Sequence, residues 1–271
     1  MCAAEAFLSN GLTDIYKLYK TIHVTELANC VGSGMGGGRS LQKLFRERYL
    51  ERPVQNDILA ETFINTTGAW LNMLLMSSAG PTRTPVAACA TALESLNQGY
   101  DLIVSGTAKV CLVGGYDDMT QDTSDEFGRM KATNNNAIDL RRGRAPHEMS
   151  RPCASSRCGF IESEGCGMQV LTSAKLALEL GLPIRSIVAH VSTASDGIGR
   201  SIPAPGKGIL STVREDFSAG ISPLLDIKYR KQLMEHSMRS IRELNASLSV
   251  PSTHAEELEL SILREEKEAR R

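Results

Sequence analysis

The stretch that decides the fold is Pro85-Val86-Ala87-Ala88-Cys89-Ala90-Thr91-Ala92-Leu93-Glu94-Ser95. A β-type run over 83–86 leads into small residues and one cysteine. Apolar residues spaced three or four apart then predict a helix that ends near Gly106. Cys89 therefore lies at or just before a helix N-terminus, where unpaired N–H groups and the helix dipole favour a thiolate.

Two interpretations of Cys89 follow from this position. Free cysteine is often a small buried hydrophobe without chemistry of its own. A strand, a turn of small residues and a nucleophile at the head of a helix are, however, how several acyl-transfer enzymes present their attacking atom. The flanking alanines favour the second interpretation, because they let backbone and substrate approach closely.

Composition sets the broad class of the protein. The 271 residues are 42% hydrophobic and 23% charged, with a formal net charge of −1, which is typical of one or two ordinary globular domains. This charge gives no electrostatic reason to expect nucleic acid. The most apolar stretch, 69–76, is too short to cross a bilayer.

The cysteine pattern argues against a metal centre. None of the seven cysteines forms a paired CxxC spacing with histidines, so zinc is not expected. Their odd number, together with an N-terminus that has neither a basic region nor a long apolar core, favours a reducing, cytoplasmic location.

A glycine loop precedes the helix predicted over 40–49. Gly32, Gly34 and Gly37 fit the pattern G-x-G-x-x-G, which suggests dinucleotide binding and hence a nucleotide-dependent oxidoreductase. The strand expected before the loop, over 23–27, is short. No strand that ends in an acidic residue follows at the usual distance, so the motif alone is weak support for that class.

The remaining pattern predicts an α/β fold in which a sheet lies between helices. The expected elements are a helical lead-in over 1–22, a long helix over 56–76 whose second half is apolar almost all round and therefore buried, strands over 109–113, 167–171 and 184–191, and a helix over 174–180. Cys111 is expected in the core. Turn formers over 201–208 predict a loop.

Charged residues gather in the polar segment 116–149. Asp117 and Asp118 suggest a metal only weakly, because no partner ligands have useful spacing, and a solvated turn is favoured. Arg141, Arg142 and Arg144 are interpreted as a solvated face. Contact with an acidic carrier protein or a phosphopantetheine phosphate is the alternative for these arginines.

The segment from Gly80 to Thr91 resembles the active-site region of β-ketoacyl-acyl-carrier-protein synthases, and is most similar to the synthase domain in the α subunit of fungal fatty acid synthases. The segment 157–167 resembles the synthase pattern Arg-x-Gly-Phe-x-x-x-Glu-Gly-x-Gly, although Cys158 stands where many relatives carry an acidic or amide residue. The resemblance extends from Ile15 to Phe217 and returns over 228–231.

The resemblance implies a fold and an organisation. Members have the thiolase-like fold, in which two similar α/β halves stack into five layers and work as a dimer. We expect residues 1–220 to be the first part of the synthase domain, so that the fold is incomplete. Residues 221–271 are expected to be a C-terminal helical insertion, with helices over 224–248 and 255–271.

The resemblance also implies roles for individual residues. Cys89 is the acyl-accepting nucleophile, and its N–H is one oxyanion donor. Gly34 and Met35 lie beside the acyl site, where Met35 gates the acyl pocket; its alternative role is that of a flexible core filler. Glu164 is expected to be a buried carboxylate that organises the backbone of the site.

The implied reaction is acyl transfer to Cys89, followed by decarboxylative Claisen condensation with a malonyl group on phosphopantetheine of a carrier domain. The segment itself is expected to bind no cofactor. Its expected partners are the acyl carrier domain, the other synthase subunits and a second copy of the chain. The family histidines stand in His-Gly-Thr and Gly-His motifs, which do not contain any of the five histidines here, His23, His147, His190, His236 and His254. The alternative is a truncated homologue that acts in synthase assembly without condensing activity.

Overall fold

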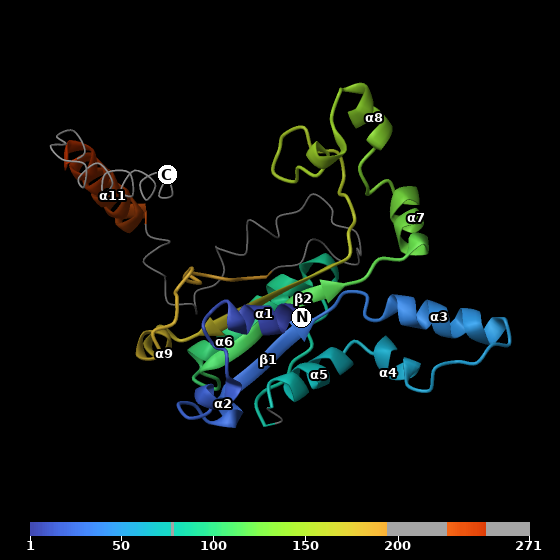
Figure 1. Ribbon diagram of the computed structural model, residues 1–271. Coiled ribbons are helices and arrows are strands. Elements are labelled where there is room, and N and C mark those ends of the chain that lie inside the picture. The colour runs from blue at the N-terminus through green and yellow to red at the C-terminus, as the bar shows by residue number, and fades with distance from the viewer. Residues whose placement is uncertain (77–78, 194–226, 248–271) are drawn as a thin grey trace, which may run out of the picture. The chain divides into compact units, whose positions relative to one another are not determined.

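The structure is a computed structural model that describes residues 1–76, 79–193 and 227–247. Within those residues three strands form one sheet: β1 (Leu27–Gly32), β2 (Val110–Asp117) and β3 (Gly165–Thr172). Their order is β1-β2-β3, with β1 parallel to β2 and β2 antiparallel to β3 (Figure 1). This mixed sheet with helices confirms the predicted α/β class.

The two faces of the sheet are built from alternating residues of the strands. Leu27 and Val31 of β1 and Leu112 of β2 belong to one buried cluster, whereas Cys30 and Cys111 belong to the other. Successive side chains of a strand point to opposite faces, so both faces of these strands need cover. Cys111 is completely buried, as the sequence predicted.

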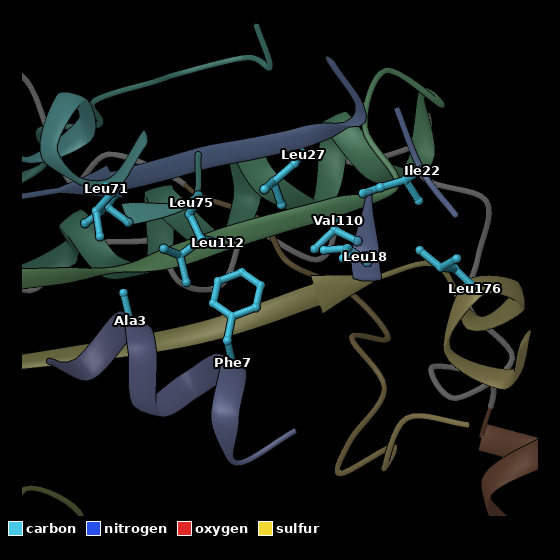
Figure 2. Close-up of a cluster of buried hydrophobic side chains, with 11 residues drawn as sticks. Ala3, Phe7, Leu18, Ile22, Leu27, Leu71, Leu75, Val110, Leu112 and Leu176 are labelled. Atoms are coloured by element: carbon cyan, nitrogen blue, oxygen red, sulfur yellow. The ribbon is translucent and has the colours of Figure 1, made fainter. Parts of the chain in front are cut away.

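Helices cover both faces. On one face α1 (Cys2–Leu8), α2 (Ile15–Leu18), α5 (Thr66–Leu74) and α9 (Ala174–Glu179) contribute to the first cluster. Figure 2 shows Ala3 and Phe7 of α1 pointing toward Leu112 of β2. On the other face lies α6 (Thr91–Val104), whose Leu102 packs with Ala28 and Val113.

Several predicted elements are confirmed with small changes in their bounds. The helix expected over 40–49 is α3 (Gly38–Tyr49), and the helix that follows Cys89 is α6, after which Gly106 adopts a φ of +73°. Strand β2 continues past Gly114 and Gly115 to Asp117. The lead-in over 1–22 is two short helices, α1 and α2.

Three predicted elements are wrong. Residues 24–26 form a short 3₁₀ turn, η1 (Val24–Glu26), capped by His23, so the strand begins only at Leu27. The helix expected over 56–76 is two helices, α4 (Ile58–Thr62) and α5, because Phe63 between them is extended. Residues 184–191 do not form a strand.

The segment beyond Pro81 lies along β1 through an isolated bridge between Asn29 and Thr82.

The sequence predicted that the apolar second half of the helix over 56–76 is buried, and this prediction is wrong in part. Leu71 and Leu75 are buried, but the exposed fractions of Trp70, Met73 and Leu74 are 50%, 73% and 50%. Helix α5 packs on β1 through Gly68 and Leu71, which are buried. Its large apolar side chains on the other side are half or more exposed in the part of the chain that the structure describes.

A polar segment with short helices joins β2 to β3. It contains α7 (Gln121–Arg129), α8 (Asn136–Arg141) and the turn η3 (Pro146–Glu148). Asp139 of α8 is completely buried and accepts two hydrogen bonds from the Arg151 guanidinium, at 2.7 and 2.9 Å. Arg144 lies 3.4 Å from the same carboxylate, so this arginine is not part of a solvated face.

The chain divides into two compact units, Met1–Ile187 and Val188–Arg271. The second unit contains α11 (Ile227–Ser247), which confirms the described part of the helix predicted over 224–248. The loop predicted over 201–208 and the helix predicted over 255–271 lie outside the described residues. The domain boundary between 220 and 221 remains a prediction. None of the described helices combines the length and apolar character that a membrane span requires.

Candidate functional site

Cys89 lies on a turn that joins an extended segment to α6. It is the middle residue of η2 (Ala88–Ala90), directly before α6, and its side chain is exposed. Ala88 has a φ of +47°, in the left-handed region that favours glycine. A residue held there costs about 1–3 kcal/mol, and such strain is concentrated at functional sites. The predicted placement of Cys89 at the head of a helix is confirmed.

Thr91 holds the turn in this conformation. Its hydroxyl donates to the Ala88 carbonyl at 2.7 Å and accepts the Ala87 N–H at 3.0 Å. The Thr91 side chain is buried, so these bonds are shielded from competition with water. One hydroxyl therefore satisfies two backbone groups on the N-terminal side of Cys89.

Ser95 fixes the same helix to the sheet one turn later. Its buried hydroxyl donates to the Cys30 carbonyl of β1 and accepts the Gly114 N–H of β2 at 2.7 Å. A buried backbone group without a partner costs about 1–3 kcal/mol. Ser95 thus sets the position of α6, and hence of Cys89, relative to both parallel strands.

The glycine loop after β1 lies against the Cys89 turn. A Cβ atom on Gly34 would lie 3.0 Å from the Ala88 carbonyl oxygen, and one on Gly32 would overlap the Pro85 carbonyl oxygen. Close backbone approach requires glycine at Gly32, and at Gly34 it leaves little room for a side chain. The loop and the nucleophile turn therefore form one packed unit, and the place of Gly34 beside an acyl site remains a prediction.

Asp117, the last residue of β2, organises that loop. Its Oδ1 accepts hydrogen bonds from the Ser33 hydroxyl at 2.8 Å, the Gly34 N–H at 2.9 Å and the Met35 N–H at 2.8 Å. The interpretation of Asp117 as part of a solvated turn is wrong. Because β1 and β2 are parallel neighbours, their C-terminal ends meet at one edge of the sheet. This parallel pairing brings Asp117 to the loop after β1.

The same contacts bear on the dinucleotide hypothesis. A phosphate-binding loop offers free backbone N–H groups to the anion. Here the N–H groups of Gly34 and Met35 already bind a carboxylate of the chain. A pyrophosphate would have to displace Asp117 against its negative charge, so the loop is arranged to support the Cys89 turn.

The predictions for Met35 and Glu164 have different outcomes. Met35 is 46% exposed, so it is not a core filler of this unit, and its role as a gate remains a prediction. Glu164 is not a buried carboxylate, because its side chain is 55% exposed and pairs with Arg39 at 2.6 Å. An exposed pair of this kind contributes about 0–1 kcal/mol.

Two of the other cysteines, Cys111 and Cys166, have surroundings that disfavour the thiolate. Burial and the Cys2 thiol raise the pKa of Cys166 to about 11. Contact with Cys30 and burial raise the pKa of Cys111. In the described part of the chain no three histidine, cysteine, aspartate or glutamate side chains gather in a way that could hold a metal ion.

Comparisons with known proteins agree with this geometry. Residues 1–177 match the family described as Beta-ketoacyl synthase, N-terminal domain, and the chain belongs to that family. The matched region contains the Cys89 turn, the glycine loop and Asp117.

The individual relatives come from fungal fatty acid synthases. The chain is 53% identical over 267 residues to the fatty acid synthase subunit alpha of Emericella nidulans. This match covers 96% of this chain and 16% of the relative. It is 51% identical over 257 residues to the same subunit of Saccharomyces cerevisiae, covering 94% of this chain and 14% of the relative. The chain thus spans a small fraction of the length of these relatives.

Solved structures show the same fold. The crystal structure of the noncanonical ketosynthase FabY from P. aeruginosa superposes with a TM-score of 0.62 at 29% identity, over 76% of this chain and 33% of that one. A beta-ketoacyl synthase from Burkholderia phymatum gives a TM-score of 0.55 at 19% identity, over 74% of this chain and 48% of that one. The predicted thiolase-like fold of ketoacyl synthases is confirmed.

Proposed function

We propose that this chain supplies the acyl-accepting part of a 3-oxoacyl-[acyl-carrier-protein] synthase in a fungal-type fatty acid synthase, with Cys89 as the nucleophile. The observation that carries the proposal is the strained turn at Ala88, which places an exposed cysteine at the head of α6. The family match and the alpha-subunit relatives support this assignment.

In the first step the Cys89 thiolate attacks the carbonyl carbon of an acyl thioester on the phosphopantetheine of a carrier domain. The bond to the carrier sulfur breaks, and the carrier thiol leaves after taking up a proton. The backbone N–H of Cys89 is the proposed donor to the developing oxyanion. Gly34 leaves room beside the turn, and Met35 is the proposed gate of the acyl pocket.

In the second step a malonyl group on the carrier loses carbon dioxide. The resulting enolate carbon attacks the acyl-cysteine, a carbon–carbon bond forms, and the Cys89 thiolate is released. The histidine motifs implied by the family resemblance do not include any of the five histidines here. We therefore assign acyl transfer to this chain and propose that condensation requires those histidines from the rest of a synthase.

The proposed partners are the acyl carrier domain, the other synthase subunits and a second copy of the chain. Exposed apolar side chains near the nucleophile turn and on α5 support an interface, among them Val86 at 57% and Met73 at 73% exposure. Large exposed apolar patches mark protein–protein contacts. The alternative is a truncated homologue that acts in synthase assembly without condensing activity.

Intact mass after incubation with an acyl-pantetheine thioester tests the proposal. The wild-type chain should gain one acyl mass, and Cys89→Ala should gain none. Cys153→Ala is the matched control, because Cys153 is also exposed and should not alter the adduct. A chain that is never acylated, or an adduct that survives Cys89→Ala, would favour the assembly role.

A further inference from the structure

A single carboxylate oxygen holds the loop that carries the proposed gate. We propose that Asp117 is a positioning residue for acyl-chain selection: it fixes the backbone of Gly34 and Met35 and so holds the loop of the proposed gate in place. This inference rests on the proposed function of Cys89 and Met35.

The hydrogen bonds at Asp117 restrain one short segment from several directions. Its Oδ1 accepts from the Ser33 hydroxyl, the Gly34 N–H and the Met35 N–H, at 2.8, 2.9 and 2.8 Å. The Ser33 hydroxyl in turn accepts the Gly36 N–H at 2.7 Å, and Ser33 is completely buried. Hydrogen bonds to a charged acceptor are roughly twice as strong as those between neutral groups.

The loop touches the nucleophile turn through backbone contact. A Cβ on Gly34 would lie 3.0 Å from the Ala88 carbonyl oxygen, and Ala88 precedes Cys89. Gly34 therefore lies in contact with the turn, while the turn itself is held by the Thr91 hydroxyl and does not depend on Asp117. Asp117 holds the Met35 backbone N–H, and the Met35 side chain is 46% exposed and has the torsional freedom of methionine.

The neighbouring carboxylate offers a matched control. Asp118 Oδ2 accepts one hydrogen bond, from the Arg39 N–H at 2.9 Å, at the start of α3. It has the same charge as Asp117 and follows it directly in the sequence, but its hydrogen bond is to Arg39, beyond Met35. A general effect of removing one negative charge should therefore appear in both variants.

Acylation kinetics of the full chain test the proposal with acetyl- and decanoyl-pantetheine as probes. Asp117→Ala should lower kcat/KM for decanoyl transfer to Cys89 by ~10-fold or more and for acetyl transfer by less than ~3-fold, since a disordered loop obstructs only the long chain. Asp117→Asn keeps one acceptor oxygen and should recover part of the loss. Asp118→Ala should stay within ~2-fold for both probes.

The alkylation rate of Cys89 by iodoacetamide separates positioning from general damage. It should change by less than ~2-fold in Asp117→Ala, because a small reagent does not need the pocket. Equal losses with acetyl, decanoyl and iodoacetamide probes, or no loss with any of them, would overturn the proposal.

Hydrogen exchange keeps the inference separable from the proposed function. If the wild-type chain accepts neither acyl group, the proposed function fails. The proposed role of Asp117 in fixing the loop is still tested by hydrogen exchange of the amides over 33–36. Asp117→Ala should speed that exchange while Asp118→Ala leaves it unchanged. Equal exchange in wild type and Asp117→Ala would show that Asp117 does not fix the loop.

Discussion

Helices α6 and α5 both lie against β1 and both make hydrogen bonds to the sheet, but α5 has the larger exposed apolar side. Helix α6 buries Thr91, Ser95 and Leu102, and Ser95 bonds to both parallel strands. Helix α5 buries Gly68 and Leu71, whereas Trp70 and Met73 are half or more exposed. The helix that directly follows the proposed nucleophile is bonded to both parallel strands, whereas α5 leaves large apolar side chains exposed.

This difference separates two kinds of apolar helix. Small and hydroxyl-bearing residues on α6 allow close approach to the sheet and satisfy backbone groups of the strands. The outer face of α5 exposes large apolar side chains. Exposed apolar surface of this kind is typical of a contact with another protein. The geometry of the candidate site thus depends on contacts internal to this chain, while α5 is suited to the proposed association of subunits.

The largest expected effect comes from the buried side of α5. Leu71→Ala should lower the free energy of unfolding by about 2–4 kcal/mol, because it leaves a cavity against β1. Leu74→Ala removes the same atoms from the half-exposed side and should cost less than about 1 kcal/mol. Urea unfolding measures both, and equal losses would show that the two sides of α5 do not differ.

The next effect concerns the anchor of α6. Ser95→Ala leaves the Cys30 carbonyl and the Gly114 N–H without their buried partner, and should lower the free energy of unfolding by about 2 kcal/mol. Ser105→Ala, at the exposed end of the same helix, is the control and should stay within about 0.5 kcal/mol. If both variants unfold at the same urea concentration, Ser95 does not anchor the helix.

Unfolding at low pH tests whether the Asp139–Arg151 contact stabilises the segment between β2 and β3. The Arg151 guanidinium, bonded to Asp139, keeps the pKa of that carboxyl below its ordinary value. The stabilising contribution is therefore complete above the unfolded pKa of about 4 and is lost as pH falls through the lower folded value. Thermal unfolding should show this loss in wild type.

Asp139→Asn isolates the contribution of that carboxylate. The variant should be less stable at pH 7, and its melting temperature should fall less steeply with acid. Asp125→Asn is a suitable control, because Asp125 forms an exposed pair with Arg129. Parallel acid profiles for wild type and Asp139→Asn would contradict the assignment of the pH dependence to this ion pair.

The smallest expected effect lies on the open side of α5. Met73→Ser should change the free energy of unfolding of the isolated chain by less than about 0.5 kcal/mol, because Met73 is 73% exposed. The same change should weaken self-association, which sedimentation velocity measures. A large loss of stability would show that this face is already packed.

The sequence identified the features with strong local signals. The spacing of apolar residues after Cys89 predicted α6, and the continuous apolar run before Gly114 predicted β2. Gly32 and Gly34 marked the loop, although their motif alone could not distinguish a phosphate cradle from a support for the turn. The resemblance carried by the segment around Cys89 indicated the family that the comparisons then showed.

The remaining errors arose where tertiary contacts decide the outcome. A strand was expected at 23–27, but the His23 cap stabilises a turn there and delays the strand to Leu27. Asp117 was interpreted as solvated because its partners, Ser33 to Met35, are about 80 residues away in sequence. Glu164 was expected to be buried, yet it pairs with Arg39 at the surface. Pairings this distant leave no periodic signal in the sequence.

The most direct test of the central claim is the location of the acyl group among the seven cysteines. Tandem mass spectrometry of peptides from the chain, after brief reaction with an acyl-pantetheine thioester near neutral pH, gives that location. The account predicts acylation at Cys89, with Cys153 and Cys166 unmodified over the same time. Acyl groups spread over several exposed cysteines, or placed on one other than Cys89, would contradict it.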